Sequence, residues 1–144
     1  LGAPAAPLAF ALAVWRRASG GFKGRGECAG NPLRDPRVNV HQGDVAECLA
    51  SGSDCFDAIL LDVDNGPEGI THSDNNWLYS SPGLERIFNT LRPQGMLAIW
   101  SAGFDPMFVI RLKKARYEVT TKTVRAREGK GSRHTIFLAK KTAH

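Results

Sequence analysis

The sequence lacks the cysteine and histidine patterns that mark disulfide-rich or metal-binding proteins. Its 144 residues include only three cysteines, and no two of them form a Cys-x-x-Cys pair. The four histidines show no spacing typical of metal ligands. An odd number of cysteines without a framework is typical of reduced thiols. These absences predict a cytoplasmic protein without a bound metal.

The sequence also has no apolar run long enough for a comfortable membrane span. The longest apolar stretch, Leu1–Trp15, is followed by Arg16 and Arg17, whereas basic residues precede the apolar part of a signal peptide. We therefore expect no membrane association and interpret Ala5–Arg17 as a buried helix. The glycine-rich stretch after it predicts a flexible linker. A chain that starts at Leu1 instead of Met is typical of a fragment or a processed product.

Charge of one sign is not in large excess. The formal net charge is +5, and charged residues make up 23% of the chain, which is ordinary for a globular protein. So mild an excess predicts a solvated surface, and on charge alone nucleic-acid binding is not expected. With 42% hydrophobic residues, the chain can build one core but not a second full domain.

From Asp35 onward, short apolar runs alternate with segments whose apolar residues recur at helical spacing. The predicted strands are Val38–His41, Ala58–Asp62, Met96–Trp100, Tyr117–Ala126 and Thr135–Ala139. The predicted helices are Val45–Ala50, Ser81–Leu91 and one that starts at Asp105. The strand–helix order favours the α/β class with a parallel sheet. The last two strands flank a loop at Glu128–Ser132 that is too short for a crossover helix, so they must be antiparallel.

The most informative segment is Phe56–Pro67, where an apolar run ends in carboxylates and a turn. The run is typical of a strand buried on both faces. Leu60, in its middle, is therefore expected in the core, and Leu60→Ala should cost on the order of 2–5 kcal/mol. Asp62 and Asp64 come at the end of this strand. Ligands of open α/β sheets bind beyond the carboxyl ends of the strands, so these carboxylates are candidates to hold a cation or accept a proton.

In order and spacing, these motifs resemble the class I S-adenosylmethionine-dependent methyltransferase fold and, within it, the spermidine synthase-like family. The motifs that carry the resemblance are Asp35–Val38, Gly43–Val45, Phe56–Asp62, Leu78–Ser80, Leu91–Trp100 and the closing hairpin. The resemblance implies a Rossmann-like methyltransferase fold over residues 31–144, with a mainly parallel sheet and a C-terminal antiparallel hairpin. Its N-terminal half is incomplete, because residues 1–30 supply no strand and glycine-rich loop for the cofactor.

The resemblance also implies roles for individual residues. Asp44, with Val45 beside it, takes the position that contacts the adenine of the cofactor; the alternative for Asp44 is a simple helix cap. Asp62 takes the position of the catalytic acid beside the attacking amine. Asp64 and Asn65 lie near a second acid of the family, and ordinary turn formation is the alternative for both. Tyr79 lies where a loop closes over the substrate.

Two functions stay open. The first is a transferase that moves an aminopropyl or methyl group to a small-molecule amine or other nucleophile. Its donor would be S-adenosylmethionine or decarboxylated S-adenosylmethionine, held weakly or not at all without the glycine loop. The second is a non-catalytic, truncated protein that serves as a binding or assembly module, and a homodimer is compatible with either. Polyamine synthases read Asp-Ser-Ser-Asp-Pro where this chain has Asp62–Pro67, which argues against a diamine substrate.

Overall fold

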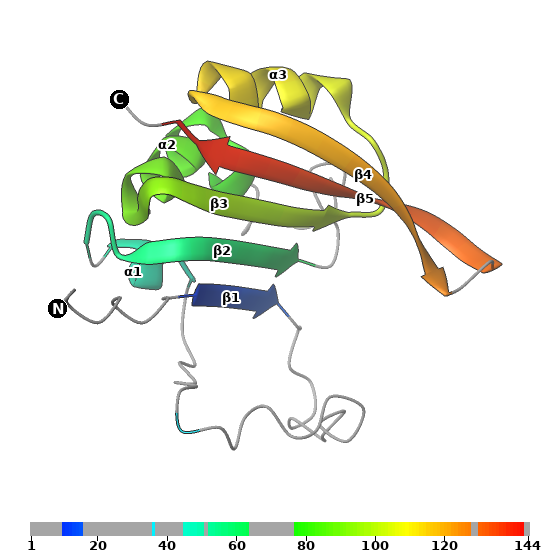
Figure 1. Cartoon of the computed structure of the whole chain (residues 1–144), viewed down its shortest axis with the longest axis horizontal. Coiled ribbons are helices and arrows are strands. Elements are labelled where there is room, and N and C mark those ends of the chain that lie inside the picture. Colours follow the sequence, from blue (N-terminus) through cyan, green and yellow to red (C-terminus); the bar gives the residue numbers. More distant parts are fainter. Residues whose placement is uncertain are drawn as a thin grey trace, which may run out of the picture.

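The computed structural model describes residues 10–15, 36, 45–50, 52–63, 77–127 and 130–142. Within them, five strands form one sheet in the order β1-β2-β3-β5-β4 (Figure 1). Neighbours among the first three strands are parallel, whereas β5 is antiparallel to both β3 and β4. The predicted α/β fold, with a mainly parallel sheet and a C-terminal antiparallel hairpin, is therefore confirmed. The strands are β1 (Phe10–Trp15), β2 (Phe56–Val63), β3 (Leu91–Ser101), β4 (Tyr117–Arg127) and β5 (Lys130–Lys141).

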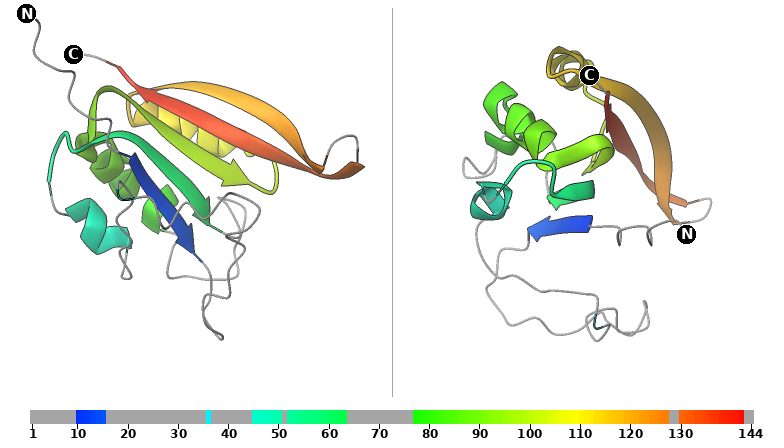
Figure 2. Two further views of the ribbon diagram at one scale, coloured as in Figure 1. Left: turned by 60° about the horizontal axis from the view of Figure 1, so that its bottom comes forward. Right: turned by 60° about the vertical axis from the view of Figure 1, so that its left-hand side comes forward.

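The described helices all lie on the same face of the sheet (Figure 2). They are α1 (Val45–Ala50), α2 (Ser81–Thr90) and α3 (Pro106–Lys114), as the sequence predicts. Capping residues explain where the two longer helices begin. The Ser80 hydroxyl accepts a hydrogen bond from the Gly83 N–H, and the Asp105 carboxylate accepts one from the Met107 N–H at 2.8 Å. A proline in the first turn of each helix fits the same geometry.

The hydrophobic core lies between the sheet and these helices. Every second residue of the central strands points toward the helices and is almost fully buried, which is the alternation expected of a pleated strand. The strand residues of this layer are Ile59, Leu61, Leu97, Ile99, Phe137 and Ala139. They pack in one cluster with the helix residues Leu49, Leu84, Ile87, Phe88, Phe108 and Leu112.

The other face of the sheet is more exposed, and here one expectation is wrong. Leu60 keeps 40% of its surface exposed, although Ile59 and Leu61 beside it are each 1% exposed. The continuous apolar run suggested burial on both faces, but in the described part of the chain the helices cover only one face. Leu60 points to the uncovered face, which we call the open face, as do the half-buried Ala98 and Leu138 of neighbouring strands.

The predicted N-terminal helix, Ala5–Arg17, is also wrong over its described residues, 10–15. Phe10–Trp15 is a strand that pairs in parallel with β2, from Phe10 beside Ala58 to Trp15 beside Val63. A short apolar run fits a buried helix or a buried strand equally well by pattern alone, and the available edge of β2 favours the strand. The rest of the predicted helix and the predicted strand Val38–His41 lie outside the described residues.

The hairpin loop is shorter than the sequence suggests. β5 begins at Lys130, which pairs with Arg127, and not at Thr135. The small and polar residues Gly131 and Ser132 favour a loop by composition. Hydrogen bonds of an antiparallel ladder join backbone groups and need no apolar side chains, so the strand continues through them, with an irregular register between the Arg125–Arg133 and Arg127–Lys130 pairs.

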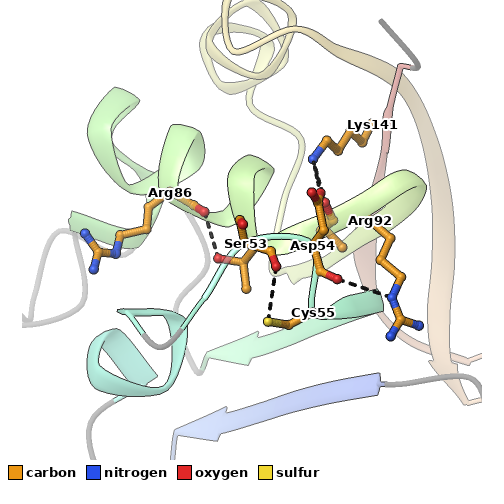
Figure 3. Close-up of polar contacts among 8 residues, drawn as sticks. Ser53, Asp54, Cys55, Arg86, Arg92 and Lys141 are labelled. Atoms are coloured by element: carbon orange, nitrogen blue, oxygen red, sulfur yellow. Dashed lines mark hydrogen bonds and ion pairs between the residues drawn. The ribbon is translucent and has the colours of Figure 1, made fainter.

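Polar contacts join three strands at the edge where β2 and β3 begin (Figure 3). The Lys141 ammonium, at the end of β5, lies 3.1 Å from the Asp54 carboxylate just before β2 and donates to the Leu91 carbonyl at 2.6 Å. The Arg92 guanidinium pairs with the Asp57 carboxylate at 2.6 Å. These charges lie at the amino ends of the parallel strands, so we assign them a structural role.

Candidate functional site

The carboxyl ends of the parallel strands define the candidate site. Because β1, β2 and β3 run in the same direction, Trp15, Val63 and Ser101 end their strands at one edge of the sheet. The antiparallel β5 brings Thr135 to the same edge, where it pairs with Ser101. This is the edge at which ligands of open α/β sheets bind.

Asp62 lies at this edge as the sequence predicts. It is the last residue but one of β2, and its side chain is exposed. Alternate residues of a strand share a face, so Asp62 lies on the open face with Leu60. Its backbone position is fixed on one side by pairing with Val14 of β1. An exposed carboxylate on a strand paired to two neighbours is a well-positioned acceptor of hydrogen bonds.

Tyr79 comes from the layer of helices and not from an exposed loop. It ends a single helical turn, Trp77–Tyr79, directly before α2, and only 5% of its surface is exposed. Two contacts with α3 hold it: its ring lies edge to face on Phe108, and its backbone carbonyl accepts a hydrogen bond from the Arg111 guanidinium at 2.9 Å. The sequence predicts Tyr79 near the substrate but not its burial.

The hydroxyl of Tyr79 is buried and has no hydrogen-bond partner among the described residues. Burial raises its pKa well above the ordinary value, and the negative charge of Asp62 adds to this shift. The two groups are thus within electrostatic reach, and the phenol stays protonated at neutral pH. We call them the Asp62–Tyr79 pair: an acceptor and an unused donor at the ligand-binding edge.

The sequence interpretation missed two aromatic residues at the same edge. The rings of Trp100 and His134 stack with centroids 4.9 Å apart and an interplanar angle of 29°. Ile99 of β3 pairs with Leu61 of β2. Trp100 and Asp62 follow these two residues, so they take equivalent positions at the ends of neighbouring strands. The buried Nδ1 of His134 has no partner among the described residues. The sequence favours an ordinary surface or strand-face histidine at this position, and only the alternation of β5 places it on the open face.

Of the other four predicted site residues, the structure describes only Val45. Val45 is the first residue of α1; it is half-buried and packs against the core. Asp44, Asp64 and Asn65 lie outside the described residues. In the part of the chain that the structure describes, no group of histidine, cysteine and acidic side chains could hold a metal ion. No helix there is both long and apolar enough to cross a membrane.

Comparison with solved structures identifies the fold. A SAM-dependent methyltransferase from Archaeoglobus fulgidus aligns with a TM-score of 0.58 and 13% identity, covering 93% of this chain and 86% of that chain. Spermidine synthase from Thermotoga maritima aligns with a TM-score of 0.54 and 16% identity, covering 78% of this chain. Only 38% of that synthase is matched, so the chain spans well under half of its length.

A third similar structure carries ligands. The 1,6-didemethyltoxoflavin-N1-methyltransferase of Burkholderia thailandensis, solved with 1,6-didemethyltoxoflavin and S-adenosylhomocysteine, aligns with a TM-score of 0.52 and 21% identity, covering 94% of this chain and 72% of that chain. No protein-family model matches the chain, and no curated protein matches it in sequence. At these identities the likeness shows the fold alone: the chain has the fold of SAM-dependent methyltransferases and spermidine synthases.

Proposed function

We propose that the chain is a spermidine synthase-like transferase that moves an aminopropyl or methyl group to an amine or another small nucleophile. The observation that carries the proposal is the unpartnered Tyr79 hydroxyl, which among the described residues has no hydrogen bond and lies within electrostatic reach of Asp62. A buried polar group without a partner costs stability, which favours a ligand as its partner. The shared fold supports S-adenosylmethionine, or its decarboxylated form, as the donor.

The Asp62–Tyr79 pair fits the acceptor side of such a reaction. When bound, a donor of this type supplies a carbon activated by a positively charged sulfur. The Asp62 carboxylate would attract a protonated amine, orient it by a hydrogen bond and accept the proton that the amine must lose before its nitrogen can attack. The Tyr79 phenol, in the helix layer, would donate a hydrogen bond to the part of a bound ligand that reaches past the end of β2 to that side of the sheet.

For the donor side we propose Asp44 and Val45, with Asp64 and Asn65 near the acceptor. Val45 supports this assignment because its side chain is only half-buried at the start of α1, which leaves apolar surface for a flat ring. Asp44 directly precedes it, and a carboxylate there can accept a hydrogen bond from the exocyclic amine of adenine.

An assay for the thioether nucleoside that remains after transfer tests the proposal, because this product forms whichever acceptor is used. The chain would be incubated with either donor and a panel of small amines. Asp62→Asn should lower kcat/KM by roughly 10²–10⁴-fold, because it keeps the shape but removes the charge and the proton acceptor. Asp64→Asn should have a smaller effect.

The matched control is Glu85→Gln, which removes one negative charge at an exposed position of α2. It should leave kcat/KM unchanged, and thermal melts should show that all variants fold. Full activity of the Asp62→Asn protein, or no thioether release by a folded chain with either donor, contradicts the proposal.

A further inference from the structure

Helix α3 carries apolar side chains on two faces. Phe108 and Leu112 are buried in the core, as expected of a helix with one apolar stripe toward the sheet. Met107 and Ile110 point the other way and keep 62% and 45% of their surfaces exposed. Residues three apart on a helix are neighbours on its surface, so these two side chains lie together. In Figure 1, α3 lies at the outer margin of the molecule, and no described element covers this side of it.

Phe104, just before the helix, extends this exposed apolar surface. It is 54% exposed, and its ring lies nearly parallel to the buried ring of Phe137, at an interplanar angle of 15°. Of the four large apolar side chains that are exposed among the described residues, three are Phe104, Met107 and Ile110. Single exposed apolar residues are ordinary, whereas a group of neighbours marks a surface that binds another molecule or a lipid interface. We call these three residues the α3 patch.

The next turn of the helix adds positive charge beside the α3 patch. Lys113 and Lys114 are exposed, and they lie three and four residues after Ile110, on the same side of the helix. The segment 106–116 contains four basic residues and no acidic one. The acidic residue just before it, Asp105, uses its carboxylate to cap the helix. The surface therefore has an apolar end and a cationic end, and it fits a partner that combines apolar and anionic groups.

These features favour a lipid surface with anionic head groups over a protein. Apolar side chains that project from a helix can insert into a lipid interface while neighbouring lysines contact the head groups. A protein interface of ordinary size involves roughly 20–30 residues on each side, far more than the α3 patch offers. We propose that the α3 patch docks on membranes that contain anionic lipids: its apolar side chains enter the interface, and the two lysines contact the head groups.

The proposal is independent of the transferase activity proposed above, and it departs from the sequence-based expectation of no membrane association. That expectation rested on the lack of an apolar run long enough to span a membrane, and docking on the surface needs no such run. Only the structure shows the patch, because the sequence does not separate the exposed Met107 and Ile110 from the buried Phe108 and Leu112.

Co-sedimentation of the full chain with lipid vesicles tests the proposal. Vesicles of phosphatidylcholine alone are compared with vesicles that also contain phosphatidylserine. At low salt the chain should bind the anionic vesicles at least about tenfold more tightly than the neutral ones. Lys113→Glu/Lys114→Glu and Met107→Gln/Ile110→Gln should each weaken binding to the anionic vesicles at least about tenfold. Glutamine is a good helix former and both apolar positions are exposed, so thermal melts should show that the variants fold.

Each variant has a matched control elsewhere on the chain. For charge, Arg86→Glu/Lys122→Glu changes the net charge equally at exposed positions of α2 and β4. For apolar surface, Leu60→Gln removes the fourth exposed side chain, which lies on the open face. Both controls should change the affinity for anionic vesicles by less than about threefold, because position matters and not only charge or hydrophobicity.

Four outcomes would overturn the proposal. In the vesicle assay, these are no binding of the unmodified chain to anionic vesicles at low salt, undiminished binding of the Met107→Gln/Ile110→Gln protein, or equal losses for the two charge-reversed proteins. The fourth is found by analytical ultracentrifugation without vesicles. Self-association of the chain that Met107→Gln/Ile110→Gln abolishes would assign the α3 patch to a second copy of the chain instead of a membrane.

Discussion

The ring of Tyr79 lies edge to face against the ring of Phe108, with centroids 5.7 Å apart and an interplanar angle of 81°. Phe108 is fully buried in α3, and Arg111 of the same helix holds the Tyr79 carbonyl. A helix that contributes no residue to the Asp62–Tyr79 pair therefore fixes the position of its phenol. Substitutions in the buried face of α3 should act on the site through this contact.

Two tyrosines with opposite hydrogen-bonding environments allow a direct comparison of stability. The Tyr117 hydroxyl donates to the Leu84 carbonyl at 3.1 Å, so Tyr117→Phe should cost about 1–2 kcal/mol of unfolding free energy. Tyr79→Phe removes a hydroxyl without a partner among the described residues and should leave stability unchanged or slightly higher. Urea melts of both proteins measure the difference. A larger loss for Tyr79→Phe would mean that its hydroxyl has a structural partner.

Stability should decrease at alkaline pH. Burial raises the pKa of both Tyr79 and Tyr117 above the ordinary value of 10.0. Above that pH the unfolded chain releases protons that the folded chain keeps, so the free energy of unfolding falls as pH rises. The stabilisation is complete below about pH 10 and is lost progressively above it. In thermal melts from about pH 9 to pH 11.5, the melting temperature of Tyr79→Phe should fall less steeply than that of the unmodified chain. The variant lacks one of the two phenols that stay protonated in the native state.

Adjacent leucines of β2 should respond very differently to the same substitution. Leu61 is 1% exposed and Leu60 is 40% exposed. Leu61→Ala should cost on the order of 2–5 kcal/mol, because it leaves a cavity in the core. Leu60→Ala should cost about 1 kcal/mol or less, since its surroundings are largely open. Equal losses in urea melts would show that the open face is covered in solution.

Donor binding is expected to be weak in the isolated chain: β1 supplies a first strand and a glycine-rich stretch follows it, but Asn31 and Pro32 stand where the helix after the cofactor loop would start. The dissociation constant for S-adenosylmethionine should exceed about 0.1 mM, which corresponds to less than roughly 5.5 kcal/mol of binding energy. Isothermal titration calorimetry measures it directly. A micromolar constant would mean that the residues after β1 complete the pocket in another way.

Elements with a strong local signal could be predicted from the sequence. Ser80 and Asp105 cap their helices next to a proline, and both helices begin where the sequence predicts. Elements that depend on their neighbours could not be predicted. Phe10–Trp15 is a strand because β2 offers it an edge, and Leu60 is exposed because no described helix covers its face.

In the candidate site, too, residues with a local sequence signal could be predicted, whereas contacts that depend on strand pairing could not. Asp62 could be found because a carboxylate at the end of an apolar run is visible in the sequence. The stacking of Trp100 on His134 joins residues on two different strands, so it depends on the register of β3 with β5. No local pattern encodes that register.

The pairing of β1 with β2 has a consequence for how the chain folds. Phe10 must find Ala58, far along the chain, whereas β4 and β5 meet across a short turn. The entropic cost of closing a loop grows with its length, and contacts between residues close in sequence form fastest. We therefore expect the hairpin to form early and β1 to dock last. A destabilising substitution in β1 should then accelerate unfolding and leave the folding rate nearly unchanged in stopped-flow measurements.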